Sequence, residues 1–188
     1  MKRSFDLVVA VIGLVVASPI IAGCVIAIRL TSPGPAIFRQ TRVGRYERSF
    51  VCLKLRTMHR DTRNLPSHEM GASAITPLGK HLRRLKLDEL PQLLNILRGE
   101  MSFVGPRPCL LSQTRLIEAR RGYGLERLRP GITGVAQVAG VDMSDPVRLA
   151  ALDATYLQDM SLKTDINLIL ATAFGAGRGD RVRSDNTR

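Results

Sequence analysis

The stretch LVVAVIGLVVASPIIAGCVIAI, residues 7–28, decides the fold class of this 188-residue chain because it contains no charged side chain. An α-helix rises 1.5 Å per residue, so the segment would reach about 33 Å, enough to cross the apolar core of a bilayer. Cleavable signal peptides have shorter apolar regions that end in small residues, and this segment does not match them. The sequence therefore predicts a helix that lies within a membrane.

Two features favour a helix that returns to the side from which it entered. Ser18-Pro19 lies near the middle of the apolar segment, where proline removes an N–H group and bends the helix, and the serine hydroxyl can satisfy the carbonyl that is left over. Both flanks are basic, with Lys2 and Arg3 before the segment and arginines from Arg29 onward after it, which favours a cytoplasmic position for both ends. Prolines also occur in ordinary spans, so a straight crossing stays open. A re-entrant helix broken at Ser18-Pro19 accounts for both features.

Composition narrows the class of partner. The net charge of +12, from 28 Lys and Arg against 16 Asp and Glu, predicts anionic partners such as nucleic acid, an acidic membrane surface or phosphate-bearing substrates. Aromatic residues make up only 4% of the chain and Trp is absent, which is poor material for stacking nucleobases. Cys24, Cys52 and Cys109 are far apart and odd in number, so neither a disulfide framework nor a metal knuckle is indicated.

The remainder of the chain predicts a predominantly α protein with a small β-hairpin. Residues 36–42 and 49–56 are β-tending runs around Gly44 and form the predicted hairpin. Apolar spacing and start signals predict helices at 79–87, 90–97, 112–122, 145–160 and 166–174, the last two opening at Asp145 and Asp165. Residues 59–77 and 129–140 are predicted as loops, and the glycines of the second would allow backbone to approach a phosphate.

These elements predict three regions. Residues 1–30 form the membrane helix, residues 31–174 a cytoplasmic domain, and residues 175–188 a disordered polar tail. We expect no internal repeat and no boundary other than the junction between the membrane helix and the soluble part.

The acidic pair Asp88-Glu89 directly precedes the predicted helix at 90–97. Pro91 is tolerated in the first turn of that helix and Gly99 is a natural stop, so we expect Asp88 at or next to the N-cap. Negative charge is stabilised there by the helix dipole and by backbone N–H groups. From this helix alone, a simple N-cap explains Asp88 better than a nucleophile or a metal ligand does.

The motifs around Asp88 change this preference for a simple N-cap. They read SPGPAIFRQTRVG at 32–44, KLRTM at 54–58, TPLGKHLRRLKLDELPQ at 76–92, GEMSFVGPRP at 99–108 and RPGITGVAQVAG at 129–140. In this order they resemble the bacterial sugar transferases, the small monotopic phosphoglycosyl transferases, from about residue 5 to residue 172. Linked motifs in the right order make the match specific, whereas a lone acidic pair would carry no weight.

The resemblance implies a covalent phosphosugar transfer. Asp88 would attack the β-phosphate of a UDP-sugar and expel UMP, and polyprenyl (undecaprenyl) phosphate would then attack the aspartyl phosphosugar. Glu89, with Asp88, would hold Mg²⁺, which takes oxygen ligands and bridges phosphates. Arg83 and Arg107 match arginines of the family pattern and suit phosphate contacts. Weaker candidates for substrate binding are Lys54, Arg56 and Arg129.

The family also implies a place and a set of partners. The membrane helix would be re-entrant with a Ser-Pro break, in the bacterial inner membrane, with the catalytic domain on the cytoplasmic face. The partners would be a UDP-sugar, polyprenyl phosphate and inner-membrane lipids, with no nucleic acid. The reaction would initiate a membrane glycoconjugate or exopolysaccharide pathway. The identity of the sugar, the pathway and any homo-oligomer are left open.

Two positions depart from the family pattern. Glu100 stands in the GEMS motif where the family commonly has Asp, and the longer side chain would shift a metal or hydrogen-bond contact. Val141 follows AQVAG where the family often has Arg, so a nucleotide or phosphate contact would be missing or supplied from elsewhere. Neither departure touches the predicted nucleophile.

Two rival functions compete with the enzyme. A non-catalytic membrane-anchored module that binds acidic lipids or nucleic acid explains the charge and the apolar helix, but adjacent acids would weaken its hold on polyanions. A phosphoester hydrolase could use the same carboxylates with water as acceptor. Such an enzyme, acting on soluble substrates, has no use for a site beside the lipid boundary.

Overall fold

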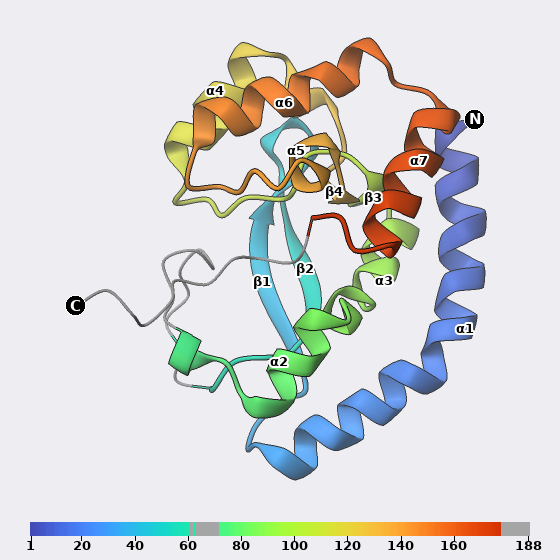
Figure 1. Ribbon diagram of the computed structural model, residues 1–188, viewed down its shortest axis with the longest axis vertical. Helices are drawn as coiled ribbons and strands as arrows, with labels where there is room; N and C mark the ends of the chain where they lie inside the picture. The colour runs from blue at the N-terminus through green and yellow to red at the C-terminus, as the bar shows by residue number, and fades with distance from the viewer. Residues whose placement is uncertain (61, 63–71, 178–188) are drawn as a thin grey trace.

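A computed structural model describes residues 1–60, 62 and 72–177 (Figure 1). Its elements, in chain order, are α1 (Lys2–Thr31), β1 (Ile37–Val43), η1 (Arg45–Glu47), β2 (Ser49–Leu55), η3 (Ala72–Ala74), α2 (Pro77–Arg84), η4 (Leu87–Glu89), α3 (Gln92–Leu97), β3 (Ser102–Val104), α4 (Thr114–Gly122), η5 (Leu125–Arg127), β4 (Gly131–Thr133), α5 (Val135–Val138), α6 (Pro146–Gln158) and α7 (Leu162–Ala173). The prediction of a mainly helical protein with one hairpin is confirmed. Most of the predicted loop at 59–77 and of the predicted tail at 175–188 lies outside the described residues.

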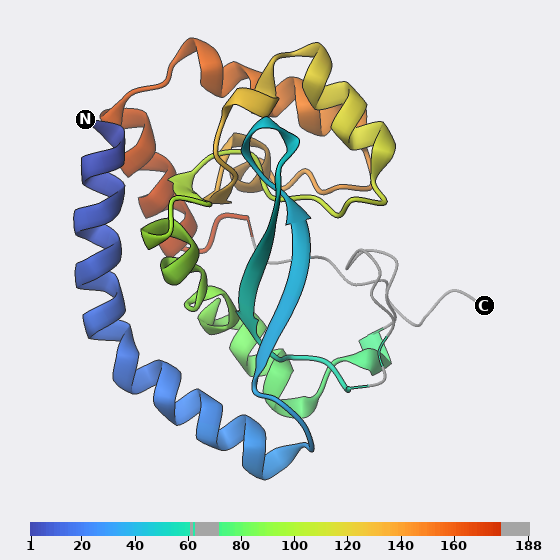
Figure 2. The same ribbon diagram turned by 180° about the vertical axis from the view of Figure 1, so that it is seen from behind.

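Helix α1 is long and apolar enough to cross a membrane, judged by length and composition. It runs along one side of the molecule and bends partway along (Figures 1 and 2). Pro19 has no N–H to give to the carbonyl of Val15, and the hydroxyl of Ser18 donates to that oxygen instead at 2.8 Å. The predicted role of the serine is therefore confirmed. The predicted break is corrected to a bend, because the helix continues on both sides of Pro19.

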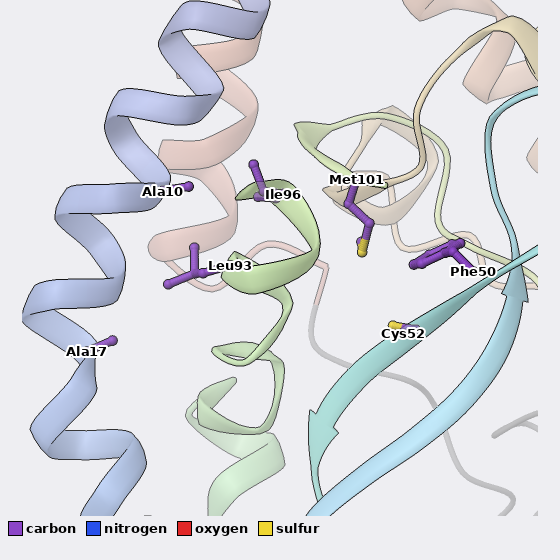
Figure 3. Close-up of a cluster of buried hydrophobic side chains, with 7 residues drawn as sticks. All are labelled: Ala10, Ala17, Phe50, Cys52, Leu93, Ile96 and Met101. Carbon is purple, nitrogen blue, oxygen red and sulfur yellow. The ribbon is translucent and has the colours of Figure 1, made fainter. Parts of the chain in front are cut away.

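One face of α1 is packed and the other is not. Ala10 and Ala17 are buried against α3, where they meet Leu93 and Ile96 (Figure 3). Gly13 continues this face, since a Cβ there would lie 3.5 Å from a methyl of Leu93. The opposite face exposes large apolar side chains, which are Val8, Val11, Ile12, Val15, Val16, Ile20, Ile26 and Leu30. The described residues leave this apolar surface uncovered.

Both ends of α1 are fastened to the same body of protein. At the start, Lys2 forms an ion pair with Asp165 of α7 at 2.7 Å. At the C-terminal end of the helix, the guanidinium of Arg56, the residue after β2, donates to the carbonyl and hydroxyl of Ser32 at 2.9 and 2.8 Å. Both ends of the helix are therefore attached to the domain that follows it.

The predicted hairpin is confirmed. Strands β1 and β2 pair antiparallel from Ile37 opposite Leu55 to Val43 opposite Ser49. The outer edge of β2 is covered by one side chain of α3, the fully buried Asn95. Its amide donates to the carbonyl of Val51 at 2.7 Å and accepts from the N–H of Leu53 at 3.0 Å. Asn95 thereby fixes α3 against the hairpin.

The prediction that 129–140 is a loop open to phosphate is wrong. Residues Gly131–Thr133 form β4, which pairs in parallel with β3, and Val135–Val138 form α5. A Cβ on Gly131 would lie 2.2 Å from the backbone nitrogen of Gly105, and one on Gly134 would lie 2.4 Å from the oxygen of the same residue. These glycines allow two strands to approach closely, which sequence spacing alone could not distinguish from a ligand loop.

Helix α6 begins as predicted, with the Asp145 side chain accepting from the N–H of Arg148 at 3.2 Å. Helix α7 begins earlier than predicted, with Ser161 as its N-cap. Asp165, the predicted start, is buried inside the helix, where it accepts from the hydroxyl of Tyr156 and pairs with Lys2. Asp165 therefore has the sequence position of a cap but serves as a buried ion-pair and hydrogen-bond partner.

Candidate active site

The acidic pair lies in a short 3-10 turn, η4, between α2 and α3. Lys86 opens the turn in the left-handed conformation, with φ of 56°. Helix α3 starts only after Pro91, which is its N-cap and provides no side-chain cap. The prediction that Asp88 lies at or next to the helix N-cap is therefore wrong, because the turn separates it from α3. Asp88 is nevertheless buried, with 7% of its surface exposed.

Lys86 fastens this turn to the end of α7. Its Nζ donates to the carbonyls of Thr172 at 3.1 Å and Ala176 at 2.9 Å. Burial lowers the pKa of Lys86, although nearby Glu89 opposes this effect. A charged group held by two carbonyls at a helix end anchors the residues that follow it.

Glu89 brings together two cations that are distant in sequence. Its Oε1 accepts from Nη2 of Arg107 at 2.7 Å and from Nζ of Lys54 at 3.1 Å. The three side chains come from η4, from the loop after β3 and from β2, and each is at most 16% exposed. The predicted residues Lys54, Glu89 and Arg107 thus form one cluster beside Asp88.

Asp88 lines a cavity of about 670 Å³ between the hairpin, the segment after β2 and the second half of α1. The charged side chains of its lining are mainly cationic, and the cationic ones are Arg29, Arg39, Arg42, Lys54, Arg56, Arg60 and Arg83. Among the described residues that line the cavity, Asp88 is the only carboxylate. Val25 of α1 and Phe38 of β1 add an apolar side. The cavity therefore suits a polyanion that also carries an apolar part.

Two of the predicted arginines lie in this lining but differ in their contacts. Arg83 donates from Nε to the hydroxyl of Thr57 at 3.0 Å, while its buried Nη1 has no partner among the described residues. Arg56 donates to Ser32 and to the carbonyl of Pro33, and so holds the chain where it leaves α1. Arg83 is the better placed of the two to receive a ligand.

Arg129 is not among the described residues that line the cavity. Its Nε donates to the carbonyl of Gly99 at 2.8 Å, just beyond α3, and Arg3 donates to the carbonyl of Ile96 at 2.8 Å. The two arginines cover carbonyls at the C-terminal end of this helix. Burial lowers the pKa of Arg129, and the charges of Arg45 and Arg3 lower it further. Arg129 does not line the cavity among the described residues, and its role in substrate binding stays a prediction.

The two departures from the family pattern have structural explanations. Glu100 accepts a hydrogen bond from the amide of Asn95 at 2.6 Å, so the longer acid supports the residue that fixes α3 to the hairpin. Val141 packs against an apolar cluster that includes Cys109 and Leu149. The side chain of Val141 thus helps to fill the space between α4, α5 and α6.

Sequence reasoning missed Asp6, Asn95 and Arg120. Asp6 is 2% exposed and accepts from the hydroxyl of Ser102 at 2.9 Å and from the N–H of Phe103 at 3.3 Å. A carboxylate directly before a long apolar run could have been noticed from its position. Asn95 and Arg120 carry no such signal, because their partners include main-chain atoms of distant segments, which leave no pattern in the sequence.

The acidic residues could supply only one or two carboxylate ligands to a metal ion. The described residues contain no group of three or more His, Cys, Asp or Glu side chains that could surround an ion. Mg²⁺ commonly binds one or two carboxylates together with substrate phosphates and water, rather than a protein cage. Asp88 and Glu89 fit that mode.

Comparison with known proteins identifies the class. The model of the bacterial sugar transferase family matches residues 1–178. The UDP-glucose:undecaprenyl-phosphate glucose-1-phosphate transferase of Caulobacter vibrioides is 42% identical over 180 residues, covering 91% of this chain and 67% of the relative. The chain belongs to the bacterial sugar transferase family, and the prediction of a phosphotransferase is confirmed at the level of class.

Two further relatives show how much of a longer protein the match can cover. The undecaprenyl-phosphate glucose phosphotransferase of Komagataeibacter xylinus is 40% identical, over 91% of this chain and 35% of the relative. The exopolysaccharide production protein ExoY of Rhizobium meliloti is 35% identical, over 91% of this chain and 83% of the relative. The region shared with these relatives includes the acidic turn and the cationic cavity.

Proposed function

We propose that this chain transfers a sugar 1-phosphate from a UDP-sugar to polyprenyl phosphate through a covalent intermediate on Asp88. The observation that carries the proposal is the cationic cavity in which Asp88 is the only carboxylate among the described lining residues. The family membership and the printed activities of the relatives support the same reaction.

The transfer consists of two displacements at one phosphorus atom. In the first, a carboxylate oxygen of Asp88 bonds to the β-phosphorus of the UDP-sugar, and the bond from that phosphorus to the bridging oxygen breaks, so that UMP leaves. In the second, a phosphate oxygen of the polyprenyl phosphate bonds to the same phosphorus, and the P–O bond of the acyl phosphate on Asp88 breaks. The product is a polyprenyl diphosphate sugar, and the carboxylate of Asp88 is restored.

The cations around Asp88 supply what phosphoryl transfer needs most, which is positioning and neutralisation of charge. Arg83 offers the cavity a buried Nη1 that has no partner among the described residues. Arg107 and Lys54 hold the carboxylate of Glu89 next to the nucleophile. Asp88 and Glu89 would bind Mg²⁺ together with the diphosphate, and when bound the ion would neutralise charge on the phosphate oxygens.

The position of the cavity beside α1 supports a lipid acceptor. Val25 and Arg29 of α1 line it, and the outer face of the same helix exposes apolar side chains. A hydrolase of soluble substrates would gain nothing from this arrangement. A lipid phosphate can place its chain along the apolar surface and its charged head among the arginines.

The contacts at the two ends of α1 support a re-entrant helix. Lys2 pairs with Asp165 and Ser32 is held by Arg56, so both ends touch one folded domain. A straight crossing would place those ends on opposite sides of an apolar layer about 30 Å thick. We therefore assign the domain to the cytoplasmic face of the inner membrane, where both basic flanks are favoured.

The test is UMP release by the purified full chain with Mg²⁺, undecaprenyl phosphate and a panel of UDP-sugars that includes UDP-glucose. Asp88→Asn removes the nucleophilic anion at nearly constant size, and we expect no UMP release. Wild-type protein without acceptor should gain the mass of one phosphosugar on the peptide that contains Asp88. Glu118→Gln, an exposed acid on α4, is the matched control and should retain activity.

The outcomes separate the candidate functions. Turnover in Asp88→Asn, or an adduct on another residue, would contradict the covalent intermediate and favour direct attack by the lipid phosphate. Removal of Mg²⁺ by EDTA should stop the reaction, and Glu89→Gln should lose turnover and weaken the dependence on the ion. A purely electrostatic binder would instead release no UMP and would bind its polyanion less tightly as Mg²⁺ is added.

A further inference from the structure

The loop that carries Arg107 is held by its main-chain oxygens. Pro106 and Pro108 lack an N–H group, so the segment offers mainly carbonyls for attachment. Four successive carbonyls each accept one hydrogen bond: Pro106 from Gly131 N at 2.9 Å, Arg107 from Arg120 Nη1 at 2.8 Å, Pro108 from Arg42 Nη1 at 2.8 Å and Cys109 from Val43 N at 2.9 Å. The backbone is thereby fixed on both sides of Arg107.

Arg120 is the residue that holds Arg107 itself. It lies in the last turn of α4 and is 9% exposed. Its second terminal nitrogen, Nη2, donates to a carboxylate oxygen of Asp153 on α6 at 2.9 Å, and Asp153 is 3% exposed. Burial raises the pKa of Asp153, while the charge and hydrogen bond of Arg120 act in the opposite direction. The planar guanidinium thus links α6 to the carbonyl of Arg107 through two contacts of fixed geometry.

We propose that Arg120 and Asp153 form a positioning pair that sets the Arg107 side chain for its contact with Glu89. The chain of contacts runs from Asp153 to Arg120 at 2.9 Å, to the carbonyl of Arg107 at 2.8 Å, and from the Arg107 guanidinium to Glu89 at 2.7 Å. The inference rests on the proposed function, because it assigns Arg107 and Glu89 to the transfer reaction. It adds two residues that do not line the cavity themselves.

The geometry distinguishes this pair from an ordinary ion pair on the same helix. Arg121, the next residue of α4, donates to both oxygens of Glu47 at 2.8 Å, but its side chain is 60% exposed. None of its described contacts reaches the loop of Arg107. Arg121→Lys is therefore the matched control for Arg120→Lys, with the same substitution one position further along α4.

The experiment is a double-mutant cycle on the full chain. Arg120→Lys keeps the positive charge but loses the fork that joins Asp153 to the carbonyl of Arg107. We expect kcat for UMP release to fall about tenfold or more, because small displacements of catalytic groups are costly, while KM for the UDP-sugar changes little. In the Arg107→Lys background the same change should have a much smaller effect. Arg121→Lys should leave kcat unchanged in both backgrounds.

A residue that only supports the fold would lower activity by the same factor in both backgrounds, and this additive result would overturn the proposal. Asp153→Asn is the second variant, because it keeps the shape of the side chain and weakens the hold on Arg120. It should reproduce the kcat loss and its dependence on Arg107. If wild-type protein releases UMP but Arg107→Lys has normal kinetics, the positioning role fails while the proposed function stands. If wild-type protein releases no UMP, the proposed function itself fails.

Discussion

Asn95 offers a quantitative test of how the site is held together. Its side chain is fully buried and makes three hydrogen bonds, to Val51 O at 2.7 Å, from Leu53 N at 3.0 Å and to Glu100 Oε2 at 2.6 Å. Asn95→Ala removes all three. Each bond to the backbone contributes about 1 kcal/mol and a bond to a carboxylate about 2 kcal/mol, so the loss is about 3–5 kcal/mol.

A loss of this size should be visible in thermal unfolding. For a chain of this length, 1 kcal/mol corresponds to about 2–4 °C, so we expect Tm to fall by about 6–20 °C. Asn95→Asp should be at least as harmful, because it places a carboxylate oxygen against Val51 O and Glu100. Activity should fall as well, since the Lys54 to Glu89 contact joins the hairpin to the turn that precedes α3.

The buried cysteines provide the assay. Cys52 and Cys109 are 2% and 1% exposed, and burial raises the pKa of both thiols, so a fluorogenic maleimide should reach them only on unfolding. A Cys24→Ala background removes the third thiol. The chain has no Trp, which makes this readout more useful than intrinsic fluorescence.

The control is Asn167→Ala, which truncates an exposed asparagine on α7 and should shift the free energy of unfolding by less than about 0.5 kcal/mol. If Asn95→Ala unfolds within about 2 °C of this control, the reasoning is refuted. Helix α3 would then be held against the hairpin by apolar packing alone.

Two further predictions concern the membrane helix and the glycines. Single cysteines that replace the exposed Ser4 and Ser49, in a background without the native cysteines, should both react only from the cytoplasmic side. Pro19→Ala should favour a helix that crosses the membrane. If the cysteine at position 4 is labelled from the far side while Pro19 is present, the helix is a true span. Gly131→Ala should abolish the folded state because its Cβ would lie 2.2 Å from a backbone nitrogen. The control Gly122→Ala, whose Cβ meets nothing within 4 Å, should shift the free energy of unfolding by about 1 kcal/mol or less. Similar Tm values for the two variants in the thiol assay would disprove the steric argument.

Local patterns in the sequence determined the elements and their chemistry. The apolar run at 7–28 specified helix α1, Ser18-Pro19 its bend, and the runs around Gly44 the hairpin, because each depends on residues that are close in sequence. The motifs determined the family and pointed to Asp88, Glu89, Lys54, Arg83 and Arg107, which the structure gathers around one cavity and its adjoining cluster.

The tertiary structure decided what each polar side chain is used for. Arg129 matched a motif, yet its guanidinium covers a carbonyl beyond α3, while Arg120 matched none and holds the carbonyl of Arg107. Asp165 had the position of a cap and is instead buried against Lys2 and Tyr156. The partners in these contacts are distant in sequence and often main-chain atoms, which any residue type can supply. Sequence pattern specifies which groups are present, whereas only the packed chain specifies which of them meet.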